Sequence, residues 1–142
     1  GLGYYVSTSS DAYQDAGSIV SMAGIDPKRV KEAIEVMLDE HKKVQSSEFR
    51  IQNSELKKAK EYLKGHLVLS LENSRSVAYY YASQELLEKK IDNPIDVIRK
   101  IDAVTIDQIE NVAKKYFVEK GLNLAVIGNF DDRQMFENLL HL

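Results

Sequence analysis

The chain of 142 residues contains no cysteine, which excludes disulfide scaffolds, thiolate metal sites and thiol nucleophiles. Long apolar runs are absent too: a run such as Leu124 to Ile127 is far shorter than the ~20 residues of a membrane-spanning helix. A glycine-rich phosphate loop is also missing, because Gly1 and Gly3 are not followed by the helix that such a loop requires. We therefore expect a soluble chain, cytoplasmic rather than in another compartment, with no membrane partner.

Neither sign of charge is in large excess. Nineteen basic and twenty-two acidic residues give a formal net charge of -3. This balance provides no general attraction to phosphate backbones, so no nucleic-acid partner is expected. The hydrophobic share of 44% and the charged share of 29% are those of an ordinary globular protein. Length and composition predict a single domain, residues 1–142, around one packed core.

Two extended runs open the chain. Residues 2–8 are rich in aromatic and β-branched types, and residues 16–25 place alternate side chains on opposite faces. We predict that these runs pair as an antiparallel hairpin, with residues 9–15 as the turn. The apolar run at residues 122–128 is predicted to join the same sheet as a third strand.

Helix starts are marked by side chains that can accept from the first free amides. Asp26-Pro27 and Asn93-Pro94 combine a capping residue with a proline, and Thr105 to Gln108 has the spacing of a capping box. Residues 42–52 are predicted to be a connector, with Asn53 or Ser54 capping the next helix. Apolar positions at three- and four-residue spacing predict helices that include residues 30–41, 56–67, 77–87, 95–101, 109–117 and 131–140. The positions that set this spacing in the first helix are Val30, Ala33, Ile34, Met37, Leu38 and His41. The predicted buried side of the second helix is Leu56, Ala59, Leu63 and Leu67. This order predicts an α+β fold, a small antiparallel sheet covered on one face by helices.

Four strings follow one another along the chain: Gly1-Leu2-Gly3-Tyr4-Tyr5-Val6; Asp15-Ala16-Gly17 leading to Ala23-Gly24-Ile25-Asp26-Pro27; Glu55 to Gly65 followed by Leu69-Ser70-Leu71-Glu72; and Ile101 to Thr105 followed by Asn123 to Gly128. In order and spacing they resemble the C-terminal domains of the pitrilysin/insulinase family of zinc metallopeptidases, which includes the mitochondrial processing peptidases. The chain also begins at Gly1, inside a predicted strand and without a methionine, so we expect a fragment of a longer parent protein.

The resemblance implies part of a mitochondrial-processing-peptidase-like metalloenzyme fold, in a parent whose homologous domains enclose a chamber where peptides are cut. The family's zinc motif, His-x-x-Glu-His with a distant glutamate, lies in the N-terminal domain, where two imidazoles and a carboxylate leave a coordination position for water. We therefore expect no catalytic residue, no metal and no other cofactor in this chain, with zinc in the parent's N-terminal domain. The implied partners are that zinc-bearing domain or a partner subunit, and a peptide substrate.

The three histidines, His41, His66 and His141, are too far apart in sequence to form a local metal motif. Met37 to His41 imitates the end of the zinc motif, but Met37 stands where the first ligand would be, and a thioether is a poor zinc donor. We interpret the stretch as an amphipathic helix with Glu40 facing water. His66 is expected to be partly exposed, and His141 lies in the tail.

Other side chains with chemical potential have structural explanations. The serines lack a nucleophile signature such as Gly-x-Ser-x-Gly. Lys57, Lys58, Lys60 and Lys64 are interrupted by acidic residues, which favours a solvated face with ion pairs over a binding patch. Tyr79, Tyr80 and Tyr81 point in different directions on a helix, so at least one should face inward and another outward. We favour core packing with one interface tyrosine over a stacking platform.

Tyr4 is the one residue to which the resemblance gives a substrate-binding role. The family pattern Arg-x-x-x-Gly-Leu-x-Tyr supplies an arginine and a tyrosine that contact the substrate backbone near the scissile bond. Gly1 to Tyr4 matches the end of this pattern, and the arginine position would precede Gly1. From the residues alone, a strand tyrosine packed against a helix is the alternative.

Three functions remain open. The leading one is a non-catalytic C-terminal fragment of a zinc metalloendopeptidase that completes its peptide-binding chamber, from a parent of one chain or of two subunits. The alternative is a structural or assembly subunit without protease activity, like the processing-peptidase-related core proteins of respiratory complexes. The presence of Tyr4, the tyrosine of the family pattern, is evidence against that alternative. A third, a helix-rich binding module without protease ancestry, is indicated if the three predicted strands fail to share one sheet.

Overall fold

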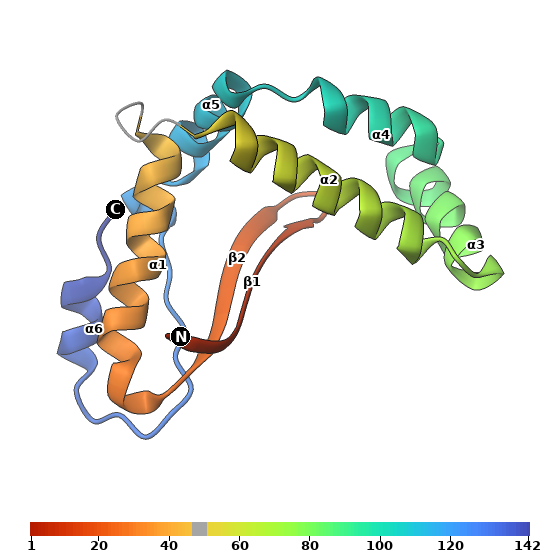
Figure 1. Cartoon of the computed structure of the whole chain (residues 1–142). Coiled ribbons are helices and arrows are strands. Elements are labelled where there is room, and N and C mark those ends of the chain that lie inside the picture. The colour runs from red at the N-terminus through yellow and green to blue at the C-terminus, as the bar shows by residue number, and fades with distance from the viewer. Residues whose placement is uncertain (47–50) are drawn as a thin grey trace. The chain divides into compact units, whose positions relative to one another are not determined.

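A computed structural model describes residues 1–46 and 51–142 of the chain (Figure 1). Within these residues it contains a two-stranded antiparallel sheet, six α-helices and three short turns of other helix types. The elements are β1 (Gly3–Ala12), β2 (Gly17–Ile25), η1 (Pro27–Arg29), α1 (Val30–Gln45), α2 (Asn53–Ser70), α3 (Ser74–Ser83), η2 (Gln84–Glu88), α4 (Pro94–Ala103), α5 (Ile106–Tyr116), η3 (Glu119–Gly121) and α6 (Arg133–Leu139). The predicted α+β class is confirmed.

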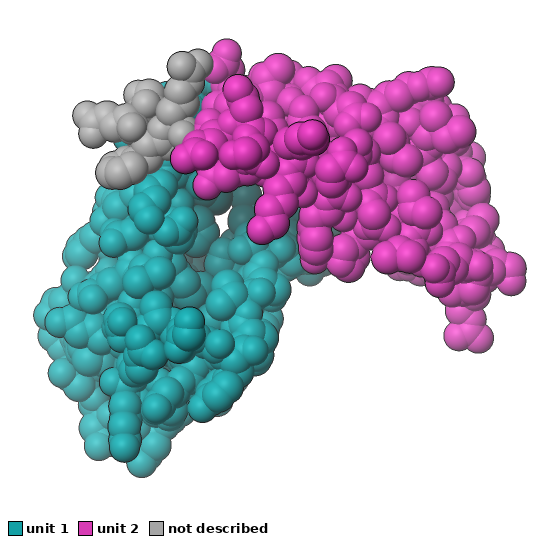
Figure 2. Space-filling view, in the orientation of Figure 1, with its two compact units in different colours: residues 1–50, 110–142 teal, residues 51–109 magenta. Residues whose placement is uncertain are grey.

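The chain forms two compact units, coloured separately in Figure 2. Unit 1 combines the start of the chain, through residue 50, with Glu110–Leu142, and unit 2 is Ile51–Ile109. The boundary falls inside α5. A single domain over residues 1–142 stays a prediction. None of the helices that the structure describes is both long and apolar enough to cross a membrane.

The hairpin of unit 1 is longer than the sequence suggested. β1 continues through Ala12 and β2 begins at Gly17, so the turn is confined to the residues between them, where the Tyr13 amide donates to the Ala16 carbonyl at 2.8 Å. The prediction that residues 9–15 form the turn was therefore too broad. Ser9 and Ser10 continue the ladder because they pair with Val20 and Ile19, and pairing outweighs the weak strand preference of serine.

Helix α1 supplies the apolar core of unit 1. Asp26 caps the preceding turn η1 by accepting from the Lys28 amide at 2.9 Å, with Pro27 in the first turn as predicted. Val30, Ile34 and Leu38 are buried along one face of α1. They pack against partly buried side chains from the end of β2 and from the C-terminal region: Ile25, Leu122, Phe130, Met135, Phe136, Leu139 and Leu142. Figure 1 shows α6 beside α1 in this unit.

The expected third strand is wrong. Residues 122–128 form no strand, and the sheet of the described chain consists of β1 and β2 alone. Leu122 packs against the core, whereas Ile127 is fully exposed. Apolar and β-branched residues favour an extended backbone, but a strand also requires a neighbour that accepts its hydrogen bonds. The segment has the composition of a strand without that neighbour.

Unit 2 is built from helices, and polar side chains connect two of them. Between α2 and α4, Lys60 Nζ donates to the Asp102 carbonyl at 2.7 Å, and Lys64 Nζ contacts the Asp102 carboxylate at 2.9 Å. The predicted buried side of α2 is correct only in part: Leu56 and Leu67 are half-buried, but Ala59 and Leu63 are exposed. No residue of this helix is fully buried. The half-buried face of α2 combines these two leucines with two lysines: Leu56, Lys60, Lys64 and Leu67.

The cap of α2 also differs from the expectation. Gln52, not Asn53 or Ser54, is the capping residue, and the Glu55 side chain accepts from its amide at 2.9 Å. Of the predicted connector, residues 42–45 belong to α1 and residues 47–50 lie outside the described residues. The other two predicted starts are confirmed: Asn93 accepts from the Asp96 amide, and Thr105 and Gln108 form a reciprocal capping box.

Candidate functional site

The residue singled out by sequence, Tyr4, lies at an irregularity in the hairpin. The register pairs Gly3 with Ile25 and Tyr5 with Gly24, so Tyr4 is an extra residue of β1 without a partner on β2. An extra residue of this kind bends a strand and changes the direction in which its side chain projects, and such irregularities are frequent beside active sites. The irregularity thus separates Tyr4 from the regular alternation of β1.

The side chain of Tyr4 is accessible. It is 85% exposed, and its hydroxyl has no hydrogen-bond partner within residues 1–46 and 51–142. The neighbouring Tyr5 is held differently, because its ring lies against Gly24, where an added Cβ would overlap the ring. Tyr5 therefore packs on the hairpin, whereas the Tyr4 phenol is free to meet another molecule or another part of a parent protein.

The backbone just before Tyr4 is anchored by Arg29 at the end of η1. The Arg29 Nη1 donates to the Gly1 carbonyl at 3.0 Å, while Nε and Nη2 donate to the two carboxylate oxygens of Glu32 at 2.9 and 3.1 Å. The hydrogen bond from Arg29 is the main reason that the pKa of Glu32 lies below its usual value, and the same bond raises the pKa of Arg29. No sequence pattern signalled this contact, which joins residues 28 positions apart.

A hydroxyl–imidazole pair links the hairpin to α1, and sequence reasoning missed it. The Ser21 Oγ hydrogen-bonds with His41 Nε2 at 3.1 Å and with Thr8 Oγ1 at 2.9 Å. A serine nucleophile needs a base that a third polar group orients. The His41 ring instead meets the edge of Phe117, with centroids 4.8 Å apart, and it forms no ion pair in the described parts of the chain. The arrangement fits packing better than catalysis.

The remaining candidates for metal binding do not converge. Glu40 faces water and pairs with Lys43 at 2.6 Å, and Leu38 is buried, as the amphipathic interpretation of this helix predicts. His66 is exposed on α2 against the Tyr62 ring, and His141 lies near Glu119. Over residues 1–46 and 51–142, no three histidine, aspartate or glutamate side chains come close enough to hold a metal ion.

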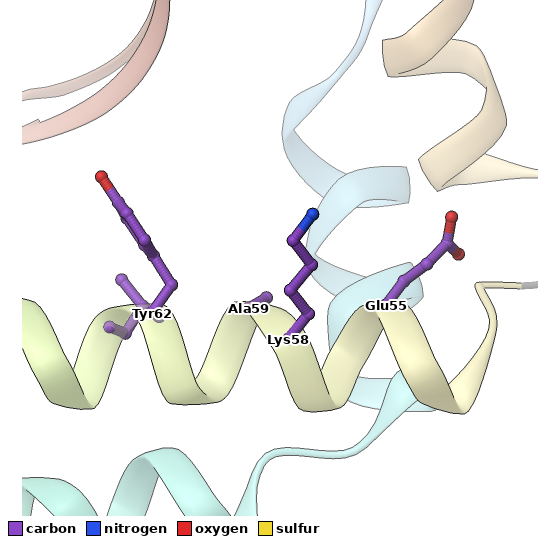
Figure 3. Close-up of a pocket in the computed structure, with 5 residues that line it drawn as sticks. Glu55, Lys58, Ala59 and Tyr62 are labelled. Carbon is purple, nitrogen blue, oxygen red and sulfur yellow. The ribbon is translucent and has the colours of Figure 1, made fainter.

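A shallow depression on α2 is drawn in Figure 3. Glu55, Lys58 and Tyr62 project from the same side of this helix, and Ala59 and Leu63 complete the lining. Because all five residues come from one helix, the depression has no opposing wall. Elsewhere on α2, Lys64 forms ion pairs with Glu61 and Asp102, as the predicted pairing of charges expects. The predicted solvated face is correct only in part, because Lys57 and Lys58 are exposed but Lys60 and Lys64 are half-buried.

The three consecutive tyrosines divide as predicted. Tyr79 is 75% exposed, Tyr80 is half-buried and donates to the Asp92 carbonyl at 2.9 Å, and Tyr81 packs edge-on against Tyr80. Tyr80, Gln84 and Asp92 form a polar corner in unit 2. The Gln84 side chain donates to the Tyr80 carbonyl and accepts from the Asp92 amide. The polar groups of the corner are thus occupied in holding α3 and α4.

Comparison with known proteins identifies relatives over most of the chain. No protein-family model matches it. The chain is 38% identical over 77 residues to the mitochondrial-processing peptidase subunit beta of Lentinula edodes, covering 54% of this chain and 16% of that protein. It is 30% identical over 128 residues to a protein of Mycobacterium tuberculosis named as an uncharacterised zinc protease, covering 90% of this chain and 28% of that protein.

The fold has a counterpart among solved structures. A chain of complex III2 from Candida albicans, solved with Inz-5 bound, matches with a TM-score of 0.70 and 25% identity over 78% of this chain and 26% of its own length. The missing third strand had favoured a binding module without protease ancestry, and these relatives contradict that interpretation. The chain spans less than a third of each of these relatives. It is a homologue of the processing-peptidase and zinc-protease proteins, as its four sequence strings predicted.

Proposed function

We propose that the chain is a non-catalytic C-terminal part of a zinc metalloendopeptidase, in which it completes a chamber that holds the peptide substrate. The observation that carries the proposal is the position of Tyr4: displaced from the strand register, exposed, and with a hydroxyl that has no partner in the described residues. The zinc and its ligands belong to the N-terminal domain of the parent or to a partner subunit. The chain alone neither holds zinc nor cuts peptides.

The chemistry of a phenol suits this task. Its aromatic body can rest on neighbouring strands while the hydroxyl donates to a peptide carbonyl. The carbonyl oxygen gains negative charge when water attacks, so donation to it stabilises the transition state more than the bound substrate. Tyr4 is therefore assigned to substrate binding and to support of the developing oxyanion.

The test is turnover by the complete parent, with its zinc-bearing partner where the two are separate chains. Tyr4→Phe removes only the hydroxyl, and we expect turnover to fall roughly ten- to a thousand-fold, as when an oxyanion donor is lost. Tyr13→Phe is the matched control: Tyr13 follows β1 at the turn of the same hairpin and is 70% exposed, and its change should leave turnover unaltered. Melting temperatures should stay the same for both variants.

Unchanged turnover in Tyr4→Phe would contradict the proposal, and a large fall in melting temperature would assign the hydroxyl to folding instead. The second candidate is a structural subunit without protease activity. The match to a chain of the complex III2 assembly favours it. A parent that carries no zinc and has no turnover, yet co-purifies in a stoichiometric assembly, would support this candidate over the first.

A further inference from the structure

The guanidinium of Arg29 connects the start of β1 to the helical segment that follows β2. Three of its nitrogens donate hydrogen bonds, two to Glu32 and one to the carbonyl of Gly1. The bidentate pair with Glu32 uses Nε and Nη2, which fixes the plane of the group and directs Nη1 at the strand. A lysine could offer a single point of contact here but could not make both contacts with this geometry.

The location of this contact matters more than its strength. Gly3 and Ile25 form the first register pair of the hairpin, and the register shift at Tyr4 follows immediately. Gly1 lies two residues before Gly3 in the chain, and Arg29, at the end of η1, lies four residues after Ile25. The contact therefore closes the open end of the hairpin beside the irregularity that displaces Tyr4.

The energetics separate positioning from stability. The side chains of Arg29 and Glu32 are 43% and 54% exposed. Exposed ion pairs contribute little to global stability, because water and salt screen them. A strand end with an irregular register frays easily, so a single additional contact there changes local order more than it changes the folding equilibrium.

We propose that Arg29 is a positioning residue for Tyr4. Held by Glu32, it fixes the Gly1 carbonyl, keeps the first register pair closed, and so maintains the register shift that directs the Tyr4 side chain outward. The consequence for catalysis rests on the proposed function, whereas the structural effect does not. A specific test can therefore address each part.

The structural part is tested by residue-resolved amide hydrogen exchange on the full 142-residue chain. Arg29→Ala should speed exchange at residues 3–6 by about tenfold and leave residues 9–12 unchanged, as expected for local fraying. The exchange rate at residues 3–6 in Arg29→Lys should lie between the rates of the native chain and of Arg29→Ala. Arg133→Ala is the control, since Arg133 forms a similar exposed pair with Glu137 at 2.8 Å and lies in the same unit.

An exchange rate at residues 3–6 of Arg29→Ala equal to that of the native chain would overturn the proposal. Faster exchange throughout the hairpin would also overturn it. If Arg29→Ala does not fold, Glu32→Gln replaces it. That variant keeps the arginine but weakens its support, so it should speed exchange at residues 3–6 less than Arg29→Ala would, and again without effect at residues 9–12.

The catalytic part is tested by a double-mutant cycle in the active parent. Arg29→Ala should reduce kcat by about tenfold, through misplacement of Tyr4, and should have no further effect in a Tyr4→Phe background. Equal reductions in both backgrounds would show that Arg29 does not act through Tyr4. If Tyr4→Phe alone leaves turnover unchanged, the proposed function fails, and the exchange experiment still decides the structural role of Arg29.

Discussion

Unit 1 and unit 2 differ in the side chains that they bury. In the described part of unit 1 the buried residues are apolar: Val30, Ala33, Ile34 and Leu38 on α1, and Ala113 on α5. In the described part of unit 2 the one buried side chain is the amide of Gln84, which bonds to two backbone groups. Unit 2 also joins α2 to α4 through Lys60 and Lys64 on Asp102.

This difference separates stability from geometry. Apolar burial contributes about 25 cal/mol per Å² without regard to direction, so it gives unit 1 its stability but few fixed angles. A typical hydrogen bond contributes only about 1 kcal/mol net, yet it fixes distance and angle. We therefore expect unit 1 to respond most to changes of side-chain volume, and unit 2 to respond most to loss of particular polar atoms.

The largest effect is expected from the core of unit 1. Leu38→Ala removes a buried side chain from the apolar face of α1 and should lower the free energy of unfolding by about 2–3 kcal/mol, through lost burial and the cavity that remains. Urea unfolding measures this change. The matched control is Leu69→Ala on α2, where the side chain is 63% exposed and the loss should stay within about 0.5 kcal/mol. Equal losses for the two variants would remove the distinction between the units.

A smaller effect is expected from the polar corner of unit 2. Gln84→Met keeps the approximate size of the side chain but leaves the Asp92 amide and one acceptor site of the Tyr80 carbonyl without their partner, at a cost of about 1–3 kcal/mol. Residue-resolved hydrogen exchange should place the loss in unit 2. Gln134→Ala, at an exposed position of α6, is the control, with a change within about 0.5 kcal/mol. An unchanged free energy of unfolding in Gln84→Met would show that packing, and not these hydrogen bonds, holds the corner.

The smallest effect is expected in the dependence of stability on pH in the acid range. Asp92 pairs with Lys100 and, at 3.7 Å, with Lys90, and the hydrogen bond from Lys100 is the main cause that lowers the pKa of Asp92 from its ordinary value of 3.8. Because the pKa of Asp92 is lower in the folded state than its ordinary value, the stabilisation by the Asp92 ion pairs is complete above pH 3.8. This stabilisation is lost as the pH falls through the lower folded pKa. The stability of Asp92→Asn should therefore fall less steeply than that of the native chain below pH 3.8.

The acid experiment has its own control in Glu72→Gln, because Glu72 is exposed and forms no ion pair among the described residues. Its pH dependence should follow that of the native chain. An Asp92→Asn profile that matches the native one would mean that the pairs with Lys90 and Lys100 do not survive in solution.

Features that depend on a few adjacent residues were predictable. Asp26-Pro27, Asn93-Pro94 and the Thr105–Gln108 box cap their helices as predicted, because a side chain and an amide two or three residues away meet whatever surrounds them. The apolar spacing of α1 likewise predicted which of its residues form the core. The family resemblance came from the same local strings, and the relatives confirm it.

Features that depend on distant partners were not predictable in this way. The buried side of α2 was assigned correctly for Leu56 and Leu67 but not for Ala59 and Leu63, because two of its faces carry apolar residues and the packing of α4 selects one. Residues 122–128 have the composition of a strand but pair with no strand among residues 1–46 and 51–142. At the candidate site, the sequence by itself determined that a tyrosine stands at position 4. The tertiary structure alone decided that this tyrosine falls on a register shift beside the Arg29 contact, because register and hydrogen bonds between residues 28 positions apart depend on how the folded chain brings its segments together.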